Sequence, residues 1–138
     1  MLSIVEQEYL LDLQLKAFNS MSDNFKKAEQ KLKPMNEEAF EQHVEETLKQ
    51  IRETLIIKGR EYRRGDNPFH NFDEGKRLTG QIRERVIDGF ALKHQISIND
   101  MVNDLEKGIN PKKEVVDEKF NDFIIYQIIK KISILDKL

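Results

Sequence analysis

The sequence predicts an all-α fold built from amphipathic helices. Apolar residues recur at steps of three and four through most of the chain, which is the spacing of one helix face. No alternating strand pattern with a short Gly turn is present, so no β-hairpin is expected. Only 3 prolines interrupt the 138 residues, and 35% of the residues are charged, as suits solvent-facing helices. We therefore expect a helical bundle of four to five helices.

The first helix is predicted over residues 2–32 and is ended by Pro34. On one face of this helix, mostly apolar residues recur at alternating steps of four and three. Such a face needs a partner surface. The residues of this stripe are Ile4, Glu8, Leu11, Leu15, Phe18, Ser22, Phe25, Glu29 and Leu32. Two interpretations are open: a long core helix, or an arm that makes the chain a homo-oligomer. We assign residues 1–34 to this helix and residues 35–138 to the main all-α domain.

The second helix is predicted to begin at Asn36, an N-cap residue, and to run to about Lys58. A segment rich in Gly, basic and aromatic residues follows over residues 58–72. A loop of this length in a helical domain is usually functional or disordered. Its aromatic residues argue against disorder. We therefore expect a long ordered loop between the second and third helices, and we expect it to carry a site.

Three further helices are predicted over residues 73–78, 82–107 and 113–136. Gly108 and Pro111 separate the last two helices, because Gly readily ends a helix and Pro cannot continue one. The middle of the last helix is apolar almost all round. We therefore expect it to be the most buried element.

The composition excludes several classes of protein. The chain has no Cys, which excludes disulfides and thiolate chemistry and fits a reducing compartment. A net charge of −2 gives no global field toward nucleic acid or an anionic membrane, so direct nucleic-acid binding is not expected. The N-terminus lacks the basic region of a signal peptide, and the longest apolar cluster is far short of the roughly 20 residues that span a bilayer. We expect a cytoplasmic protein that does not enter membranes.

Two polar clusters stand where helix periodicity predicts burial. Lys93, Ser97 and Asp100 share one helix face, and His94 lies one step round from it. In the segment of residues 58–72, basic residues suit phosphate oxygens. His70 there is either a general acid or base near neutral pH or a partner for a loop carbonyl.

The second polar cluster is a row of Glu118, Asp122 and Tyr126, each four residues from the next. Two carboxylates one helical turn apart can share Mg²⁺, which prefers oxygen ligands. They can equally accept hydrogen bonds from Lys58 or Lys93 in a partly buried ion network. A solvent-exposed row is a third possibility, which the flanking apolar residues weaken. The residues alone leave these interpretations open.

Taken in order, these motifs resemble a known family. They are Lys58-x3-Tyr62, Asn67-Pro-Phe-His-Asn-Phe72, Lys93-His94-x2-Ser97-x2-Asp100 and Glu118-x3-Asp122-x3-Tyr126. This order resembles the nucleotide-modification-associated domain 1 family, small proteins common in phages. That family is similar in layout to the all-α NTP pyrophosphohydrolases of the MazG-like and dimeric dUTPase group. The resemblance covers about residues 45–135.

The resemblance implies an oligomeric helical bundle with a nucleotide pocket, in which carboxylates on two helices hold Mg²⁺ against an NTP phosphate. Carried over to this chain, the metal ligands are Asp100, Glu118 and Asp122. The substrate-binding residues are Lys58, Tyr62, Arg63, Asn67, His70, Asn71, Phe72, Lys93 and His94. Among these, Tyr62 or Phe72 would stack on a base, and Asn67 or Asn71 would read its edge. Lys119 stands where the enzymes usually carry a second Glu.

Three functions follow as hypotheses. The first is a phage-type nucleotide-binding protein that acts as a Mg²⁺-dependent (d)NTP pyrophosphohydrolase. The second is a non-catalytic nucleotide-sequestering or host-interaction (counter-defence) protein, which needs only the binding pocket. The third is a helical oligomeric assembly protein that works through residues 2–32.

Overall fold

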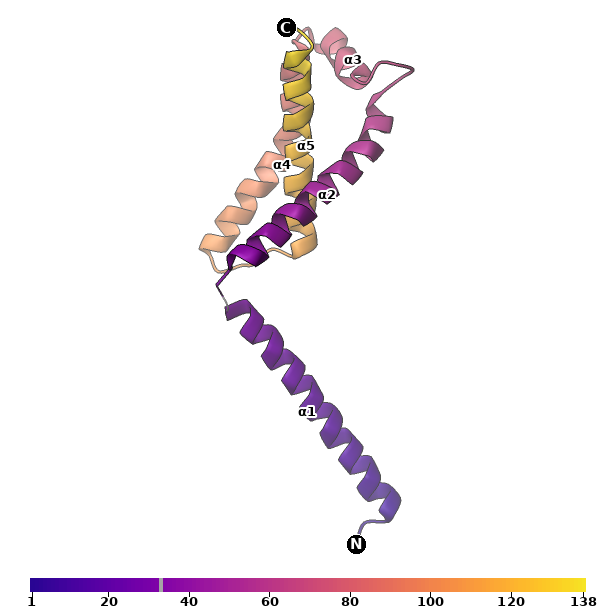
Figure 1. The fold of residues 1–138 in the computed structure, drawn as a ribbon, viewed down its shortest axis with the longest axis vertical. Coiled ribbons are helices and arrows are strands. Elements are labelled where there is room, and N and C mark those ends of the chain that lie inside the picture. Colours follow the sequence, from indigo (N-terminus) through magenta and orange to yellow (C-terminus); the bar gives the residue numbers. More distant parts are fainter. Residues whose placement is uncertain (33) are drawn as a thin grey trace. The chain divides into compact units, whose positions relative to one another are not determined.

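The computed structural model is all-α, which confirms the predicted fold class (Figure 1). It describes the backbone of residues 1–32 and 34–138, and the side chains of residues 1–23 and 34–138. The helices are α1 (Ile4–Leu32), α2 (Glu37–Tyr62), α3 (His70–Thr79), α4 (Arg83–Glu106) and α5 (Lys113–Leu135). None of these helices, over the residues described, is long and apolar enough to cross a membrane.

The chain divides into two units, Met1–Phe40 and Glu41–Leu138. The first unit holds α1, which begins with a reciprocal cap. The Glu6 N–H donates to the Ser3 hydroxyl at 3.2 Å, and the Ser3 N–H donates to the Glu6 carboxylate at 3.1 Å. This exchange satisfies backbone donors that a helix start leaves free. The predicted stripe positions Phe25, Glu29 and Leu32 lie outside the described side chains.

α2 begins as predicted, because the Asn36 side chain accepts a hydrogen bond from the Ala39 N–H at 2.8 Å. Its far end differs from the prediction, since α2 continues beyond Lys58 to Tyr62. α3 also starts earlier than predicted, at His70. The connection is therefore residues 63–69, and much of the expected loop is helical. The prediction ended the second helix at about Lys58, just before Gly59, but an isolated Gly within a helical pattern is tolerated.

The connection itself is a tight turn. Arg64 and Asn67 each donate a backbone N–H to the other's carbonyl, at 3.2 and 3.0 Å. Gly65 sits inside the turn with a φ of 56°, where a side chain would be strained. The turn brings the start of α3 close to the end of α2.

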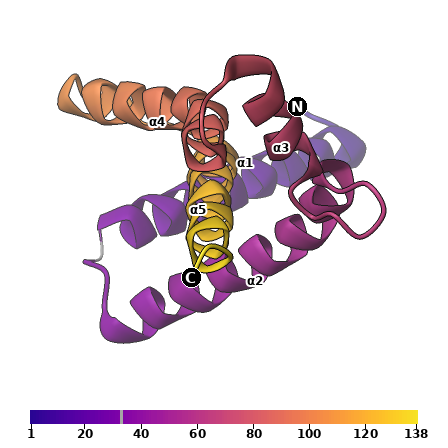
Figure 2. The ribbon, with the colours of Figure 1, turned by 90° about the horizontal axis from the view of Figure 1, so that it is seen from above.

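The core of the second unit lies where α2, α3, α4 and α5 meet. Its buried cluster consists of Tyr62, Phe72, Val86, Ile87, Ala91 and Tyr126. α4 and α5 are antiparallel, since contacts run from Glu84 beside Ser133 to His94 beside Asp122. Seen along α5, α4 and α2 lie on different sides of it (Figure 2).

The prediction that the last helix is the most buried element is confirmed only in part, because α5 has fewer exposed residues than α4 but also fewer fully buried ones. α4 has six buried residues and α5 has four. Phe120 and Ile132 on α5 are 40% and 48% exposed. The apolar residues of α5 surround the helix, whereas its neighbours cover only part of that circumference.

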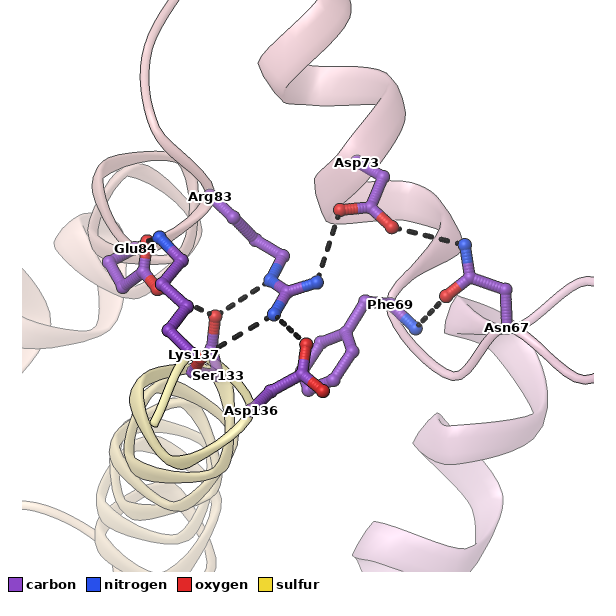
Figure 3. Close-up of polar contacts among 8 residues, drawn as sticks. All are labelled: Asn67, Phe69, Asp73, Arg83, Glu84, Ser133, Asp136 and Lys137. Atoms are coloured by element: carbon purple, nitrogen blue, oxygen red, sulfur yellow. Dashed lines mark hydrogen bonds and ion pairs between the residues drawn. The ribbon is translucent and has the colours of Figure 1, made fainter.

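A guanidinium joins α3, α4 and α5 at one end of this unit (Figure 3). The side chain of Arg83 is only 12% exposed, and it ion-pairs with Asp73 at 3.4 Å and Asp136 at 2.7 Å. Its Nε donates to the Ser133 hydroxyl at 2.7 Å. Its charged carbon lies 4.0 Å from the centre of the Phe69 ring. These four partners satisfy the guanidinium, so the cluster has a structural role.

Glu84 extends this cluster from the next position on α4. Its carboxylate accepts hydrogen bonds from Ser133 at 3.0 Å and Lys137 at 2.6 Å. The hydrogen bond from Lys137 lowers the pKa of Glu84 to about 2, helped by that from Ser133 and opposed by burial.

We expect Arg83→Met to lower the free energy of unfolding by about 2 to 4 kcal/mol, because two carboxylates lose a partly buried partner. Urea denaturation would measure the change. Arg85→Met is the matched control, since the Arg85 side chain is 71% exposed and a surface change stays within about 0.5 kcal/mol. Equal effects of the two substitutions would contradict a structural role for the Arg83 cluster.

The lowered pKa of Glu84 predicts a pH dependence. Its carboxylate stabilises the fold fully above its ordinary pKa of 4.5, and that contribution is lost as the pH falls toward about 2. Glu84→Gln should therefore flatten the fall of the urea midpoint between about pH 5 and pH 3. The exposed Glu106→Gln should leave the fall unchanged. An unchanged slope in Glu84→Gln would show that its carboxylate is not held in this way.

Two glycines predict opposite effects of alanine. A Cβ at Gly75 would lie 2.5 Å from Cγ1 of Val86, a stiff branched side chain on α4. Gly75→Ala should lower the free energy of unfolding by about 1 to 2 kcal/mol through overpacking. A Cβ at Gly89 meets nothing within 4 Å, so Gly89→Ala should raise stability by up to about 1 kcal/mol. Thermal melts would contradict this packing if the two changes had the same sign.

Candidate functional site

Two pairs of side chains, each one helical turn apart, face each other between α2 and α5. Lys58 and Tyr62 lie on α2, and Asp122 and Tyr126 lie on α5. The Lys58 ammonium is 3.3 Å from the Asp122 carboxylate, and the two tyrosine hydroxyls are 2.9 Å apart. The Lys58 ammonium also lies 5.6 Å from the centre of the Tyr126 ring. We call these four residues with His94 the polar cluster.

His94 enters the polar cluster from α4. Its ring stacks on Tyr126, with centres 5.6 Å apart and planes at 25°. Its Nδ1 lies 3.7 Å from the Asp122 carboxylate, which is too long for a hydrogen bond. His94 is 4% exposed, and this Nδ1 has no hydrogen-bond partner among the residues described. An unpaired buried polar atom costs about 1 to 3 kcal/mol, so its retention calls for an explanation.

The charges of lysines on three helices act on this histidine. Burial lowers the pKa of His94, and Lys93, Lys58 and Lys119 lower it further, whereas Asp122 opposes them. The imidazole is therefore neutral near pH 7. Asp122 offsets one ammonium, and Glu118 lies 3.4 Å from Lys119 but faces solvent. Three ammonium groups and one carboxylate, that of Asp122, act on His94, whereas Glu61 adds a negative charge near Tyr62.

Tyr62 remains protonated at neutral pH. Burial raises the pKa of Tyr62 far above its ordinary value, and the hydrogen bond with Tyr126 raises it further. Either hydroxyl is able to donate to the other. The pair closes the inner side of the polar cluster and links it to the apolar core.

A small apolar pocket lies between α2, the connection and α5. Its volume is about 150 Å³. It shares Tyr62 with the polar cluster, and its other walls are Leu55, Gly59, Pro68, Phe69, Ile129 and Ile132. It offers space for an apolar ring but contributes little polar surface to identify one.

The structure brings together four of the residues predicted from sequence: Lys58, Tyr62, His94 and Asp122. The predicted stacking roles do not fit the packing. Phe72 is fully buried and Tyr62 is nearly so, because both rings belong to the core. Phe72 offers no free face to a base, and Tyr62 reaches only the small apolar pocket. The aromatic residues that identified the segment are thus core residues.

Other predicted binding residues hold the local fold. The Asn67 side chain accepts from the Phe69 N–H at 2.9 Å and donates to Asp73 at 3.1 Å. The Asn71 side chain donates to the Glu61 carbonyl at 3.4 Å. Both amides therefore fasten the start of α3 instead of presenting free edges to a ligand.

Of the remaining predicted residues, one directly follows α2, one begins α3 and one lies on α4. Arg63 is exposed in the connection. His70 is half-buried in the first turn of α3. Lys93 is exposed on α4, close enough to His94 to affect its pKa.

The predicted magnesium ligands do not form a donor set. Asp100 and Glu118 are exposed, whereas Asp122 directs its two oxygens toward Lys58 and His94. Over the described residues, no three His, Asp or Glu side chains gather closely enough to hold a metal ion. Because Mg²⁺ in proteins relies on carboxylate oxygens, this arrangement does not fit a resident Mg²⁺.

Two contributors to the region were missed from sequence. Lys119 was noted only as a departure from an acidic motif, although its position three residues before Asp122 places it near the same face. Asn121 is buried and donates to Gln50 on α2 at 2.7 Å. No local signal identifies this contact, because the two residues are 71 positions apart.

Fold and site together define an all-α domain with a lysine-rimmed polar cluster. No family model matches this chain, and neither the curated proteins nor the solved structures gave a match. The resemblance to phage nucleotide-modification proteins therefore stays a prediction. The function has to be argued from the polar cluster itself.

Proposed function

We propose that this chain binds a phosphate-bearing small molecule, with a nucleotide as the ligand class, and that it does so without hydrolysing it. One observation carries the proposal: the charges of lysines on α2, α4 and α5 act on a buried histidine whose Nδ1 has no hydrogen-bond partner among the residues described. Phosphate oxygens accept charge-assisted hydrogen bonds from ammonium groups. Lys58, Lys93 and Lys119 are the residues to which we assign this contact.

Electrostatics favours an anion here over a cation. Asp122 already lies 3.3 Å from Lys58, so an added cation would meet the remaining ammonium groups of Lys93 and Lys119. A phosphate would instead compete with Asp122 for Lys58. At an effective dielectric constant of 20, two unit charges 4 Å apart interact by about 4 kcal/mol before desolvation. The apolar pocket beside Tyr62 supports a ligand that carries a ring as well as phosphate.

Binding without hydrolysis agrees with the side chains present. A metal-assisted pyrophosphohydrolase would need carboxylates gathered around Mg²⁺, and the described residues do not provide that group. The non-catalytic hypothesis needs only the lysines. A nucleotide-sequestering role, of the kind expected for a phage protein, is therefore the form of the proposal that the site supports best.

A thermal-shift panel tests the proposal. The purified chain would be melted with (d)NTPs, pyrophosphate or phosphate, each with Mg²⁺ or EDTA, and the nucleotides then separated by chromatography. A ligand at 100 times its Kd should stabilise the fold by about 2.7 kcal/mol. Nucleotides should exceed pyrophosphate if the apolar pocket takes a ring. Nucleotide monophosphates appearing only with Mg²⁺ would instead establish hydrolysis.

Asp122→Asn separates the two mechanisms. If the site binds anions, removing this carboxylate frees Lys58, so nucleotide affinity should rise several-fold. If Asp122 held Mg²⁺, the same variant would lose metal-dependent binding or turnover. Titration calorimetry with and without EDTA would measure the difference.

Lysine variants locate the site. Lys58→Gln and Lys119→Gln should each weaken nucleotide binding by about tenfold, since a charge-assisted contact contributes about 1.5 kcal/mol. Lys131→Gln is the matched control, because Lys131 is exposed further along α5. Equal affinity in all three variants would place any nucleotide elsewhere on the chain.

A further inference from the structure

α1 exposes more apolar surface than an isolated helix tolerates. Nine large apolar residues between Ile4 and Met21 are each 43 to 74% exposed. They include Leu11, Leu15 and Phe18 of the stripe identified in the sequence. Burying such a side chain gains about 1.5 to 3 kcal/mol. Large exposed apolar surfaces mark interaction sites.

The charges of α1 identify an occupant. Residues 4–15 hold three carboxylates and no basic residue, whereas residues 16–32 hold four lysines and two carboxylates. Among the described residues, Asp12 pairs with Lys16 within the helix at 2.9 Å, which leaves Glu6 and Glu8 as the acidic groups of the first half. The two halves of α1 therefore carry opposite net charge. A second copy in antiparallel orientation would match acidic to basic halves.

We propose that α1 pairs in antiparallel orientation with α1 of a second copy of this chain. The midpoint of Ile4–Leu32 is residue 18, so the two Phe18 side chains meet at the centre of the pair. Leu11 and Leu15 of one copy lie along the same seam on one side of that centre, and those of the second copy lie on the other side. Parallel pairing would oppose like charges along the whole helix, which destabilises it.

Because the chain has no Cys, a single spin label reports the orientation directly. In an antiparallel pair centred on residue 18, residue 7 of one copy lies opposite residue 29 of the other. The two labels of Gln7→Cys are therefore 22 residues apart along the axis, or roughly 33 Å at 1.5 Å per residue. Pulsed electron resonance should give a distance near this value. A distance below about 20 Å would show parallel pairing and overturn the proposal.

Light scattering tests the surface itself. The wild-type chain should be a dimer at micromolar concentration, and Leu11→Gln/Phe18→Gln should be monomeric with its helical content largely kept. Glu8→Lys/Asp12→Lys should weaken the dimer on the order of tenfold at low salt and less at high salt. Glu45→Lys/Glu53→Lys, with the same charge change on exposed positions of α2, should leave it intact.

Two outcomes would overturn the pairing. A monomeric wild-type chain would show that α1 is covered by another surface, such as the second unit or a different partner. A dimer unaffected by Leu11→Gln/Phe18→Gln would place the interface outside α1. Neither result depends on nucleotide binding, so it leaves the proposed function untouched.

Discussion

The contact between Tyr62 and Tyr126 is the interaction on which the arrangement of the second unit depends. The hydroxyls meet at 2.9 Å, and both rings lie in the core with Phe72. This contact fixes the end of α2 against the middle of α5. The residues one turn earlier, Lys58 and Asp122, are thereby brought into an ion pair. The polar cluster is therefore a consequence of aromatic packing as much as of charge.

Two polar groups of this unit differ in how well they are satisfied. The Arg83 guanidinium has partners on three sides and a ring beneath it, so it adds specificity to the packing of α3, α4 and α5. His94 is more deeply buried, but its Nδ1 stays 3.7 Å from the Asp122 carboxylate. Evolution tolerates such a cost where a function requires it. That contrast is the reason for placing the site at His94 and not at Arg83.

The helices could be predicted from neighbouring residues in the sequence, whereas the site could be predicted only in part. The Asn36 cap and the Gly108 stop follow from single residues and their neighbours, and both lie where the sequence placed them. The segment of residues 58–72 was misjudged because helix propensity and tertiary packing override one glycine. The three proposed metal ligands were chosen from the order of motifs along the sequence. Metal coordination depends instead on how α4 and α5 are rotated against each other. Sequence spacing within one helix does not fix that rotation.

The small apolar core limits the stability of the second unit. The second unit buries only nine apolar side chains, a small core for its length, and several large residues of α2, α4 and α5 stay exposed. Folding free energy is a small difference between large terms, so a small core leaves little margin. Association removes apolar area from water and ties stability to concentration. Pairing of α1 would remove apolar area from water in this way. Because none of the five residues of the polar cluster lies on α1, mutations can test assembly and ligand binding separately.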